Sequence, residues 1–416
     1  MFLWLIKCYD ENKETDCNII IVFLAIMNKR VYLFFLFAIA IVLYVFERDT
    51  MFSEDIVEEK TVSTTIPVML LLVLSLTAVL LSHKPVLKDK LSRKYSYLWF
   101  FICIISLLYS MYYPLGSRVI YGMIVLPIIL FYFSSTTTQF AKSDNIIVWT
   151  ITIVFLFLLY YYFNNYYNSE LLNTERTTNG SYVMLYLLPF LLCHKKRHFR
   201  ILAMLLTLVA IMFSLKRGGF VALLAAIVVY LLISQIGINK KRFLFWRLLL
   251  LIILSIGFYM LINYLNENVL EGFLFGRFEK DDTGSGRMTI YQKYWMMLLN
   301  SSPWHLLVGH GWQGSIRDSG IGYTCHNDFL ESIVDFGIIG FILYLLLYIE
   351  LIKLCKRMVR DNNEYAPAMG ASIAMFFMNS MVSHILIYPK YLILFSLFWG
   401  FIVSTTPKYK VKKIIQ

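Results

Sequence analysis

One polar stretch of the sequence, YTCHND at 323–328, runs directly into an apolar stretch and carries a side chain well suited to proton transfer, His326. Histidine has a pKa near neutrality, so its ring takes a proton from a hydroxyl group and releases it again. Glu331 and Asp335 follow inside the apolar stretch, four residues apart, and therefore share one face of a helix. Carboxylates at membrane depth need partners, and either Arg217 or His326 would supply them.

Two arginines offer positive charge of the kind that binds phosphate. Arg217 follows Lys216 in the polar stretch SLKRGG between two apolar segments, and Arg287 opens the segment RMTIYQKYW. A guanidinium group binds phosphate oxygens through paired hydrogen bonds and keeps its charge at neutral pH. Taken alone, each arginine is also compatible with a solvated loop cation, so its role depends on what lies beside it.

Metal and thiol chemistry have weaker support in the residue pattern. His305, His310 and His326 share one loop and His384 lies near a predicted span end, but no cysteine or carboxylate accompanies them at the spacing of a metal site. The six cysteines are scattered singly. Cys325 is a poor nucleophile candidate, because its neighbour His326 would have to activate it and adjacent side chains rarely point at one another. We therefore expect no metal and no cofactor. A metal enzyme stays as an alternative that retained activity in EDTA would exclude.

The elements that must position these residues are predicted to be membrane helices. Of the 416 residues, 59% are hydrophobic and 15% are charged, against about a quarter charged in a soluble protein. The apolar residues form blocks about as long as a helix that crosses a bilayer, and such blocks predict an all-α, polytopic helical bundle. Twelve spans are expected, at 31–46, 66–82, 97–113, 117–133, 145–163, 181–193, 200–214, 218–236, 243–264, 329–352, 368–386 and 390–405.

Basic residues mark alternate loops of this bundle. The formal net charge of +12 would suit a nucleic acid, but the charges gather in particular loops. Those segments are 29–30, 83–94, 142, 194–200, 239–247, 353–360 and 407–413. Basic loops stay in the cytoplasm, so both termini are expected there and the intervening loops face outward. The charge therefore indicates topology, and no nucleic-acid partner is expected.

The long outward loop, 266–328, is the predicted home of the reactive residues. Apolar spacing over 284–299 is typical of a helix with one apolar face. A proline stop and a glycine-flanked turn at 309–311 follow, so we expect a short helix along the membrane, a turn, and then re-entry. Asn327 and Asp328 are expected to cap the span that comes next.

The remaining organisation follows from these spans. The expected parts are a cytoplasmic segment 1–30, helices over 31–265, the loop 266–328, helices over 329–405 and a basic tail 406–416. The stretch before Met27 interrupts the hydrophobic pattern, so we expect Met27 to be the natural start and 1–26 to be upstream sequence. No cleavable signal peptide is expected.

Four stretches together resemble the superfamily of bacterial O-antigen ligases and O-antigen polymerases. SLKRGGFVALLAAIVVYLL resembles the family's Ser-x-x-Arg-Gly segment, and SGRMTIYQKYW resembles its Ser-Gly-Arg before an aromatic helix. PWHLLVGHGW resembles its Pro…Gly-x-Gly turn, and HNDFLESIVDFGIIGFILYLLLY resembles its His-Asn…Leu-Glu…Gly segment. Order and spacing agree over 213–350, about a third of the chain.

The resemblance implies a glycosyltransferase of the bacterial inner membrane that works at the periplasmic face without metal or nucleotide sugar. Its donor would be an oligosaccharide on undecaprenyl diphosphate, and its acceptor a sugar hydroxyl. His326 would be the base, while Arg217 and Arg287 would stabilise the departing diphosphate. The residues expected to bind substrate are Lys216, Glu331 and Asn327. Attack opposite the diphosphate would invert the anomeric centre.

The acceptor stays open at this level. A polymerase that extends a lipid-linked glycan is slightly favoured, because no further segment is recognisable that would recruit another acceptor. A ligase acting on lipid A-core and a protein O-oligosaccharyltransferase are the alternatives. A lipid-linked glycan flippase belongs to a different class, but no repeat of one half of the chain in the other supports it. A chain-length regulator is a possible protein partner.

Overall fold

The computed structural model describes residues 90–110, 126–141, 144–168, 180–214, 217–234, 287–312, 314–320, 324–386 and 389–405. Every regular element in these ranges is a helix, so the all-α prediction is confirmed for the part of the chain described. The predicted spans at 31–46, 66–82 and 243–264 lie outside the described residues, as do Met27 and Lys216.

Nine of the described helices overlap predicted spans. They are α5 (Lys90–Ser110), α7 (Leu126–Ala141), α8 (Asp144–Asn168), α9 (Gly180–Leu191), α10 (Arg197–Ser214), α11 (Arg217–Ile233), α17 (Asp328–Arg360), α18 (Ala366–Val382) and α19 (Pro389–Thr405). Within the described residues, α8, α10 and α17 are long and apolar enough to cross a membrane, and α9, α11, α18 and α19 are apolar but shorter. A total of twelve spans stays a prediction.

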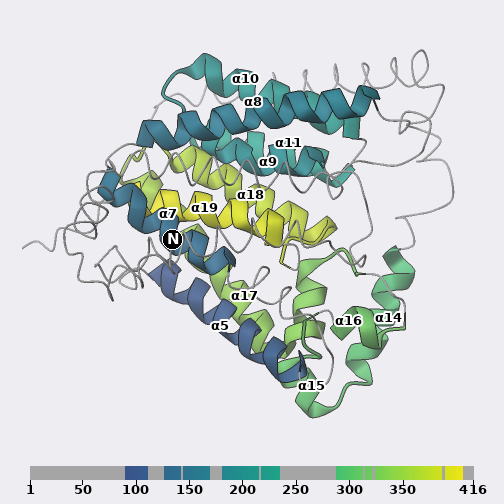
Figure 1. Cartoon of the computed structure of the whole chain (residues 1–416). Helices are drawn as coiled ribbons and strands as arrows, with labels where there is room; N and C mark the ends of the chain where they lie inside the picture. The colour runs from purple at the N-terminus through teal and green to yellow at the C-terminus, as the bar shows by residue number, and fades with distance from the viewer. Residues whose placement is uncertain are drawn as a thin grey trace, which may run out of the picture.

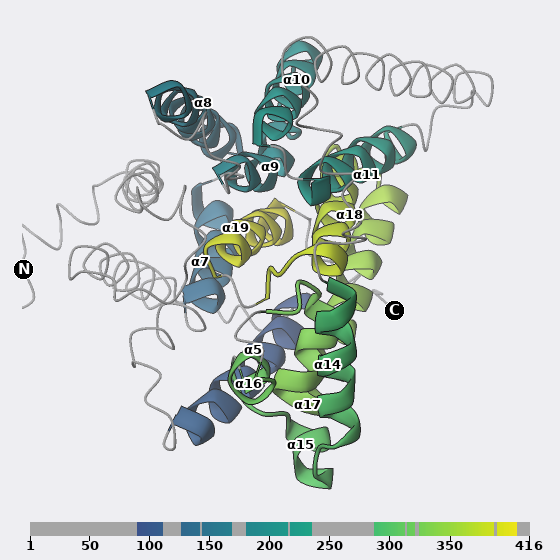
Figure 2. The ribbon, with the colours of Figure 1, turned by 90° about the vertical axis from the view of Figure 1, so that its right-hand side faces the viewer.

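Three shorter helices lie in the segment predicted to be the long outward loop. They are α14 (Arg287–Leu299), α15 (Pro303–Val308) and α16 (Gly314–Asp318). The proline expected to stop a helix instead begins one, because Pro303 occupies the first turn of α15, where its missing N–H costs nothing. In both views these helices lie together against the first part of α17 (Figures 1 and 2).

The bundle is held by close helix pairs, notably α7 with α19 and α11 with α18 (Figure 2). Gly400 of α19 meets α7 so closely that a Cβ there would lie 2.9 Å from the Cβ of Ser134. The Ser134 hydroxyl donates to the Leu397 carbonyl at 2.8 Å. Small residues and side-chain hydrogen bonds of this kind bring helix backbones together where water supplies no driving force.

Helix α17 breaks at Gly337. Its φ of 64° and ψ of −171° are not helical, and glycine adopts them without steric cost. The break frees the carbonyls of Val334 and Asp335, which accept hydrogen bonds from the backbone N–H groups of His310 and Gly311 at 3.0 and 2.8 Å. A loop from between α15 and α16 therefore fills the gap in the helix, which meets the requirement that backbone groups in a membrane protein stay paired.

The break divides α17 into two parts with different directions (Figure 1). At about 1.5 Å per residue, the part after Gly337 is about as long as a bilayer is thick. Its exposed apolar side chains, including Ile338, Ile342 and Leu345, recur at helical spacing along one stripe, as a lipid-facing surface requires. The first part, 328–336, is thus not needed to cross the bilayer and instead carries the residues next to His326.

Candidate active site

One end of the bundle gathers the residues singled out from the sequence. A Cβ placed on Gly218, at the start of α11, would lie 2.9 Å from Val382 Cγ2 at the end of α18 and 3.1 Å from the Tyr182 hydroxyl at the start of α9. The rings of Tyr182 and Tyr391, near the start of α19, are 6.0 Å apart. In the predicted alternation of loops all four of these helix ends belong to one side, and the contacts bring them together.

His326 precedes Asn327, the N-cap of α17, and has a left-handed backbone, with φ at 54°. Residues other than glycine rarely adopt this backbone conformation, and they keep it only where the surrounding structure holds them. The His326 ring stacks on that of His384, with the centroids 4.6 Å apart and the planes at 29°. His384 is buried, and its Nδ1 atom lies 3.1 Å from the Thr324 hydroxyl.

Asn327 is the N-cap of α17, as predicted. Its side-chain oxygen accepts from the backbone N–H groups of Phe329 and Leu330 at 3.0 and 3.1 Å. Its amide nitrogen donates to the Met381 carbonyl at 3.3 Å, which ties the start of α17 to the end of α18. The Asn327 side chain therefore supplies acceptors for backbone N–H groups that have no partner within α17, and it also joins α17 to α18.

Asp328 does not cap the helix, so that prediction was wrong. Its carboxylate is fully buried and accepts from the backbone N–H groups of Ile385 and Leu386 at 3.0 and 3.1 Å. The Tyr344 hydroxyl also donates to it at 3.3 Å. Asp328 lies inside the first turn and points into the bundle, where the chain leaving α18 offers donors that outcompete its own helix.

Arg287 begins α14, as the sequence predicted, and is half-buried. Its guanidinium group lies close enough to the hydroxyl groups of Tyr182 and Tyr291 to interact with them electrostatically. Burial raises the pKa of Tyr291, and the charge of Arg287 and a hydrogen bond with Asn327 offset part of this rise. Arg287 therefore lies at the same end of the bundle as the start of α17.

Arg217 is the first residue of α11, so its backbone stands at the helix N-terminus beside Gly218. Its side chain and the whole of Lys216 lie outside the described residues. The first turn of a helix carries N–H groups without intrahelical partners and attracts anions. The backbone position of Arg217 is thus compatible with the phosphate-binding role predicted for it.

Glu331 does not form the hydrogen bond to His326 that we considered. Its side chain is 1% exposed, and neither carboxylate oxygen has a hydrogen-bond partner among the described residues. The backbone N–H of Cys325 lies close to it, outside hydrogen-bond geometry. Burial, followed by the nearby charge of Glu331, raises the pKa of the Cys325 thiol, which disfavours the thiolate needed for nucleophilic attack.

Asp335, the second carboxylate on this face, accepts a hydrogen bond from the backbone N–H of Ser315 in α16 at 2.8 Å. This partner comes from α16, just after the loop that fills the break in α17, and it is neither of the two predicted, Arg217 and His326. Asp335 therefore fastens α16 to the first part of α17.

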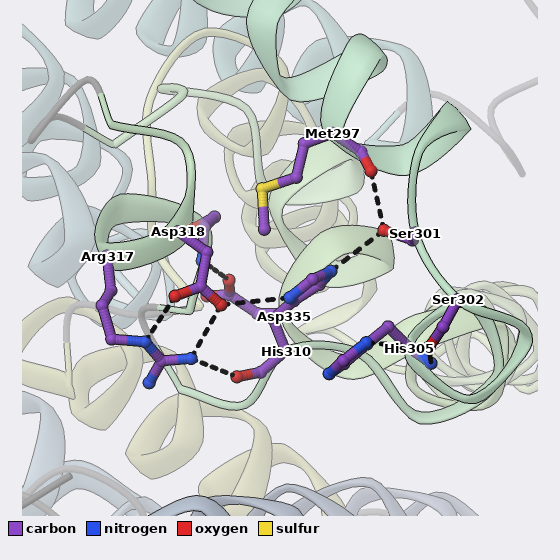
Figure 3. A network of polar contacts seen from close by, with 9 residues as sticks. Met297, Ser301, Ser302, His305, His310, Arg317, Asp318 and Asp335 are labelled. Atoms are coloured by element: carbon purple, nitrogen blue, oxygen red, sulfur yellow. Dashed lines mark hydrogen bonds and ion pairs between the residues drawn. The ribbon is translucent and has the colours of Figure 1, made fainter.

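A second polar cluster braces the break from the other side (Figure 3). His310 Nδ1 lies 3.1 Å from an Asp318 oxygen, and His310 Nε2 lies 3.0 Å from the Ser301 hydroxyl. Arg317 binds Asp318 through Nε at 2.6 Å and also donates to the His310 carbonyl at 3.0 Å. Burial, followed by the charge of His305, lowers the pKa of His310. These contacts fix α15 and α16 around the break.

The histidines of this cluster do not converge on a metal position. His305 stacks on His310 with centroids 4.3 Å apart and planes at 7°, and its Nδ1 lies 2.9 Å from the Ser302 hydroxyl. In the described ranges no three histidine, cysteine, aspartate or glutamate side chains gather as a metal site would need. The absence of a metal stays a prediction for the whole chain.

The comparisons with known proteins agree with the resemblance read from the motifs. The family model described as O-antigen ligase matches residues 202–345, which include Arg217, Arg287 and His326. The search of curated proteins found no match. His384, which the sequence offered only as a metal candidate, lies beyond the matched segment. Residues 202–345, about a third of the chain, are therefore similar to the O-antigen ligase family over the same stretch that carries the sequence motifs.

Proposed function

We propose that this protein transfers a glycan from undecaprenyl diphosphate to a sugar hydroxyl at the periplasmic face of the bacterial inner membrane. The observation that carries the proposal is the gathering of His326, Arg287 and the start of α11 at one end of the bundle. The segment that matches the family model spans these three elements.

His326 acts as the general base. As the acceptor oxygen attacks the anomeric carbon, its proton passes to a ring nitrogen of His326. The bond from that carbon to the diphosphate oxygen breaks, and the electron pair leaves with the diphosphate. Attack from the side opposite the diphosphate inverts the anomeric centre. A histidine suits this role because its neutral form is abundant near neutral pH.

Arg217 and Arg287 stabilise the charge that develops on the diphosphate, with Lys216 as a further cation. Guanidinium groups keep their charge and bind phosphate oxygens in pairs, so they replace the divalent ion that other glycosyltransferases use. No metal or cofactor takes part in this scheme. Asn327 and Glu331 were predicted to bind substrate. We now assign Asn327 to holding the helices of the site in place, because its amide already joins α17 to α18.

For the acceptor we favour a second lipid-linked glycan, which makes the protein a polymerase. The long loop predicted outside the membrane is 266–328, and its described helices pack on α17, so the part of this loop that the structure describes holds no separate module to recruit lipid A-core or a protein. A deletion strain decides between the acceptors. A single repeat unit on core indicates a lost polymerase, whereas lipid-linked polymer without O-chain on core indicates a lost ligase.

The reaction itself is tested with purified full-length protein in liposomes that contain lipid-linked oligosaccharide with a radiolabelled sugar. We expect longer glycans whose new glycosidic bonds are seen by electrophoresis and mass spectrometry. Movement of intact lipid across the bilayer, without new bonds, would contradict the proposal and favour the flippase class.

A further inference from the structure

His384, which lies outside the segment that matches the family model, contacts the proposed base directly. It follows the end of α18 and is buried, and its ring covers one face of the half-buried His326 ring at a centroid distance of 4.6 Å. The two residues come from different helix ends, so their contact exists only in the folded bundle.

The position of His384 is fixed from three directions. Its Nδ1 atom lies 3.1 Å from the Thr324 hydroxyl. The chain before it is tied to the start of α17 by the amide of Asn327, and the chain after it by the carboxylate of Asp328. The residues on both sides of His326 thus help to hold the ring on which His326 rests.

His326 needs such support because of its backbone. With φ at 54°, it occupies a conformation that a residue with a side chain rarely adopts. Proton transfer requires the base to lie within hydrogen-bond reach of the hydroxyl, and small misplacements of a reacting group are costly. The buried ring of His384, which is held by its own contacts, covers one face of the His326 ring and restricts its rotation.

We propose that His384 is a positioning residue that fixes the plane of the His326 ring and directs a ring nitrogen toward the acceptor hydroxyl. The rings meet face to face, an arrangement that holds a plane without exchanging a proton, so His384 acts through the position of His326. This inference rests on the proposed function, because it gives His384 a part in the same transfer.

The test compares three variants of the full-length protein in the liposome assay with lipid-linked oligosaccharide. His384→Ala removes the supporting ring, and we expect kcat to fall about 100-fold while KM for the donor changes less than about threefold. His384→Phe keeps a ring for stacking, and we expect it to restore most of kcat. Thr324→Val removes the hydroxyl that orients His384 and should lower kcat severalfold. His198→Ala, at an exposed histidine in the first turn of α10, is the matched control.

A spectroscopic measurement separates positioning from general stability. A stacked aromatic ring shifts the ring resonances of its neighbour, so the signals of His326 in protein labelled at histidine should move in His384→Ala and stay nearly unchanged in His384→Phe. Loss of the same signal in His326→Ala assigns it. A purely structural role would lower the thermal midpoint in both His384 variants without this difference.

Several outcomes would overturn the inference: wild-type kcat in His384→Ala, a loss confined to KM, or His326 resonances that ignore the substitution. If His384→Ala does not fold, wild-type kcat in Thr324→Val has the same consequence. Failure of the proposed function is distinct, because the wild-type protein would then form no glycosidic bond. In that case His326→Ala and the wild type would be equally inactive.

Discussion

Among the described residues there are two stacked histidine pairs, one near each end of the first part of α17. His326 lies on His384 at 4.6 Å, and His305 lies on His310 at 4.3 Å. The two pairs share ring chemistry and nearly the same separation, but their surroundings differ. His310 has both ring nitrogens engaged, by Asp318 and by Ser301, in a cluster whose charges compensate one another.

The pair at His326 has a different electrostatic setting. Tyr291 lies close to both Arg287 and Asn327, the residue after His326. The N-terminus of α11 lies at the same end of the bundle. Arg287 has no ion pair among the described residues and is available to an anionic substrate, whereas Arg317 is already bound to Asp318. The comparison teaches that a histidine pair is assigned from the charges around it, since stacking geometry alone would treat both pairs alike.

The largest expected effect comes from removing the base. We expect His326→Ala to lower kcat by about 1,000-fold or more, because the proposed acceptor of the hydroxyl proton is lost. Formation of labelled glycan in liposomes is the measurement, and His305→Ala is the comparison, with an expected change of less than about threefold. Equal losses in the two variants would erase the distinction between the pairs.

Removing the positive charge should have the next largest effect. We expect Arg287→Ala to lower kcat by about 100-fold through lost stabilisation of the diphosphate, and Arg287→Lys to recover part of it, since lysine keeps the charge but not the paired hydrogen bonds. Arg217→Ala should behave in the same way. Arg317→Ala, which breaks the pair with Asp318, is the matched control and should leave kcat nearly unchanged. Full activity in Arg287→Ala would remove that residue from the mechanism.

Much of the scaffold of the site was predictable from the sequence. The starts of α11, α14 and α17 fall within a few residues of their predicted positions, because polar stretches interrupt apolar periodicity there and Asn327 is a capping residue type. The family motifs named Arg217, Arg287 and His326 for the same reason: they are polar residues at the boundaries of apolar segments.

The break in α17 was not predictable, and its two glycines show why. Gly337 and Gly340 stand three residues apart in DFGIIGF, and nothing local distinguishes them. Gly340 stays helical, and a Cβ there would lie 3.3 Å from a ring atom of Phe101. Gly337 is non-helical because the backbone around Gly309 fills the gap beside it. The difference arises from a loop that is distant in sequence.

The contact between His326 and His384 escaped prediction on similar grounds. It depends on how the chain leaving α18 folds back to the start of α17, where Asp328 binds the backbone of Ile385 and Leu386. Asp328 stands at the start of its own helix, so the sequence predicted a capping role for it. A single sequence does not reveal hydrogen-bond donors from another part of the chain. Such contacts between helix ends require the tertiary structure.

The loop that fills the break in α17 should reveal its role through stability, and Gly337→Ala is the sharpest probe. At Gly337 an added Cβ would meet the backbone at Leu307 and Gly309, so we expect a loss of about 4 kcal/mol from strain and overlap together. Gly320 also has a positive φ, but nothing lies within 4 Å of an added Cβ there. Gly320→Ala should therefore cost only about 1 kcal/mol, from backbone strain alone. Thermal unfolding in detergent compares the two, and equal midpoints would show that the loop does not support the break.

The smallest expected effect is a pH dependence of stability from His310. Burial and the charge of His305 lower its pKa, so the unfolded chain takes up protons more readily as the pH falls below about 6.5, the ordinary value for histidine. The free energy of unfolding should then decrease with falling pH until the pH passes the lower, folded pKa. Asp318 acts at still lower pH: burial raises its pKa, but the hydrogen bonds and charge of Arg317 lower it more, so its contribution is lost only as the pH falls through that lowered pKa.

The hydrogen bonds of Ser301 act in the opposite direction to burial. Its hydroxyl lies 2.7 Å from the Met297 carbonyl and 3.0 Å from His310 Nε2, yet it carries one proton (Figure 3). With His310 neutral and its Nδ1–H donating to Asp318, the single Ser301 proton serves either Nε2 or Met297. Once His310 is protonated, Nε2 donates to Ser301 while Ser301 donates to Met297, and burial with the charge of His305 outweighs this gain. His310→Asn removes the titrating group, so its thermal midpoint should fall less than that of the wild type between pH 7 and pH 5. An identical fall in both proteins would place the acid sensitivity elsewhere, including at the His326 pair.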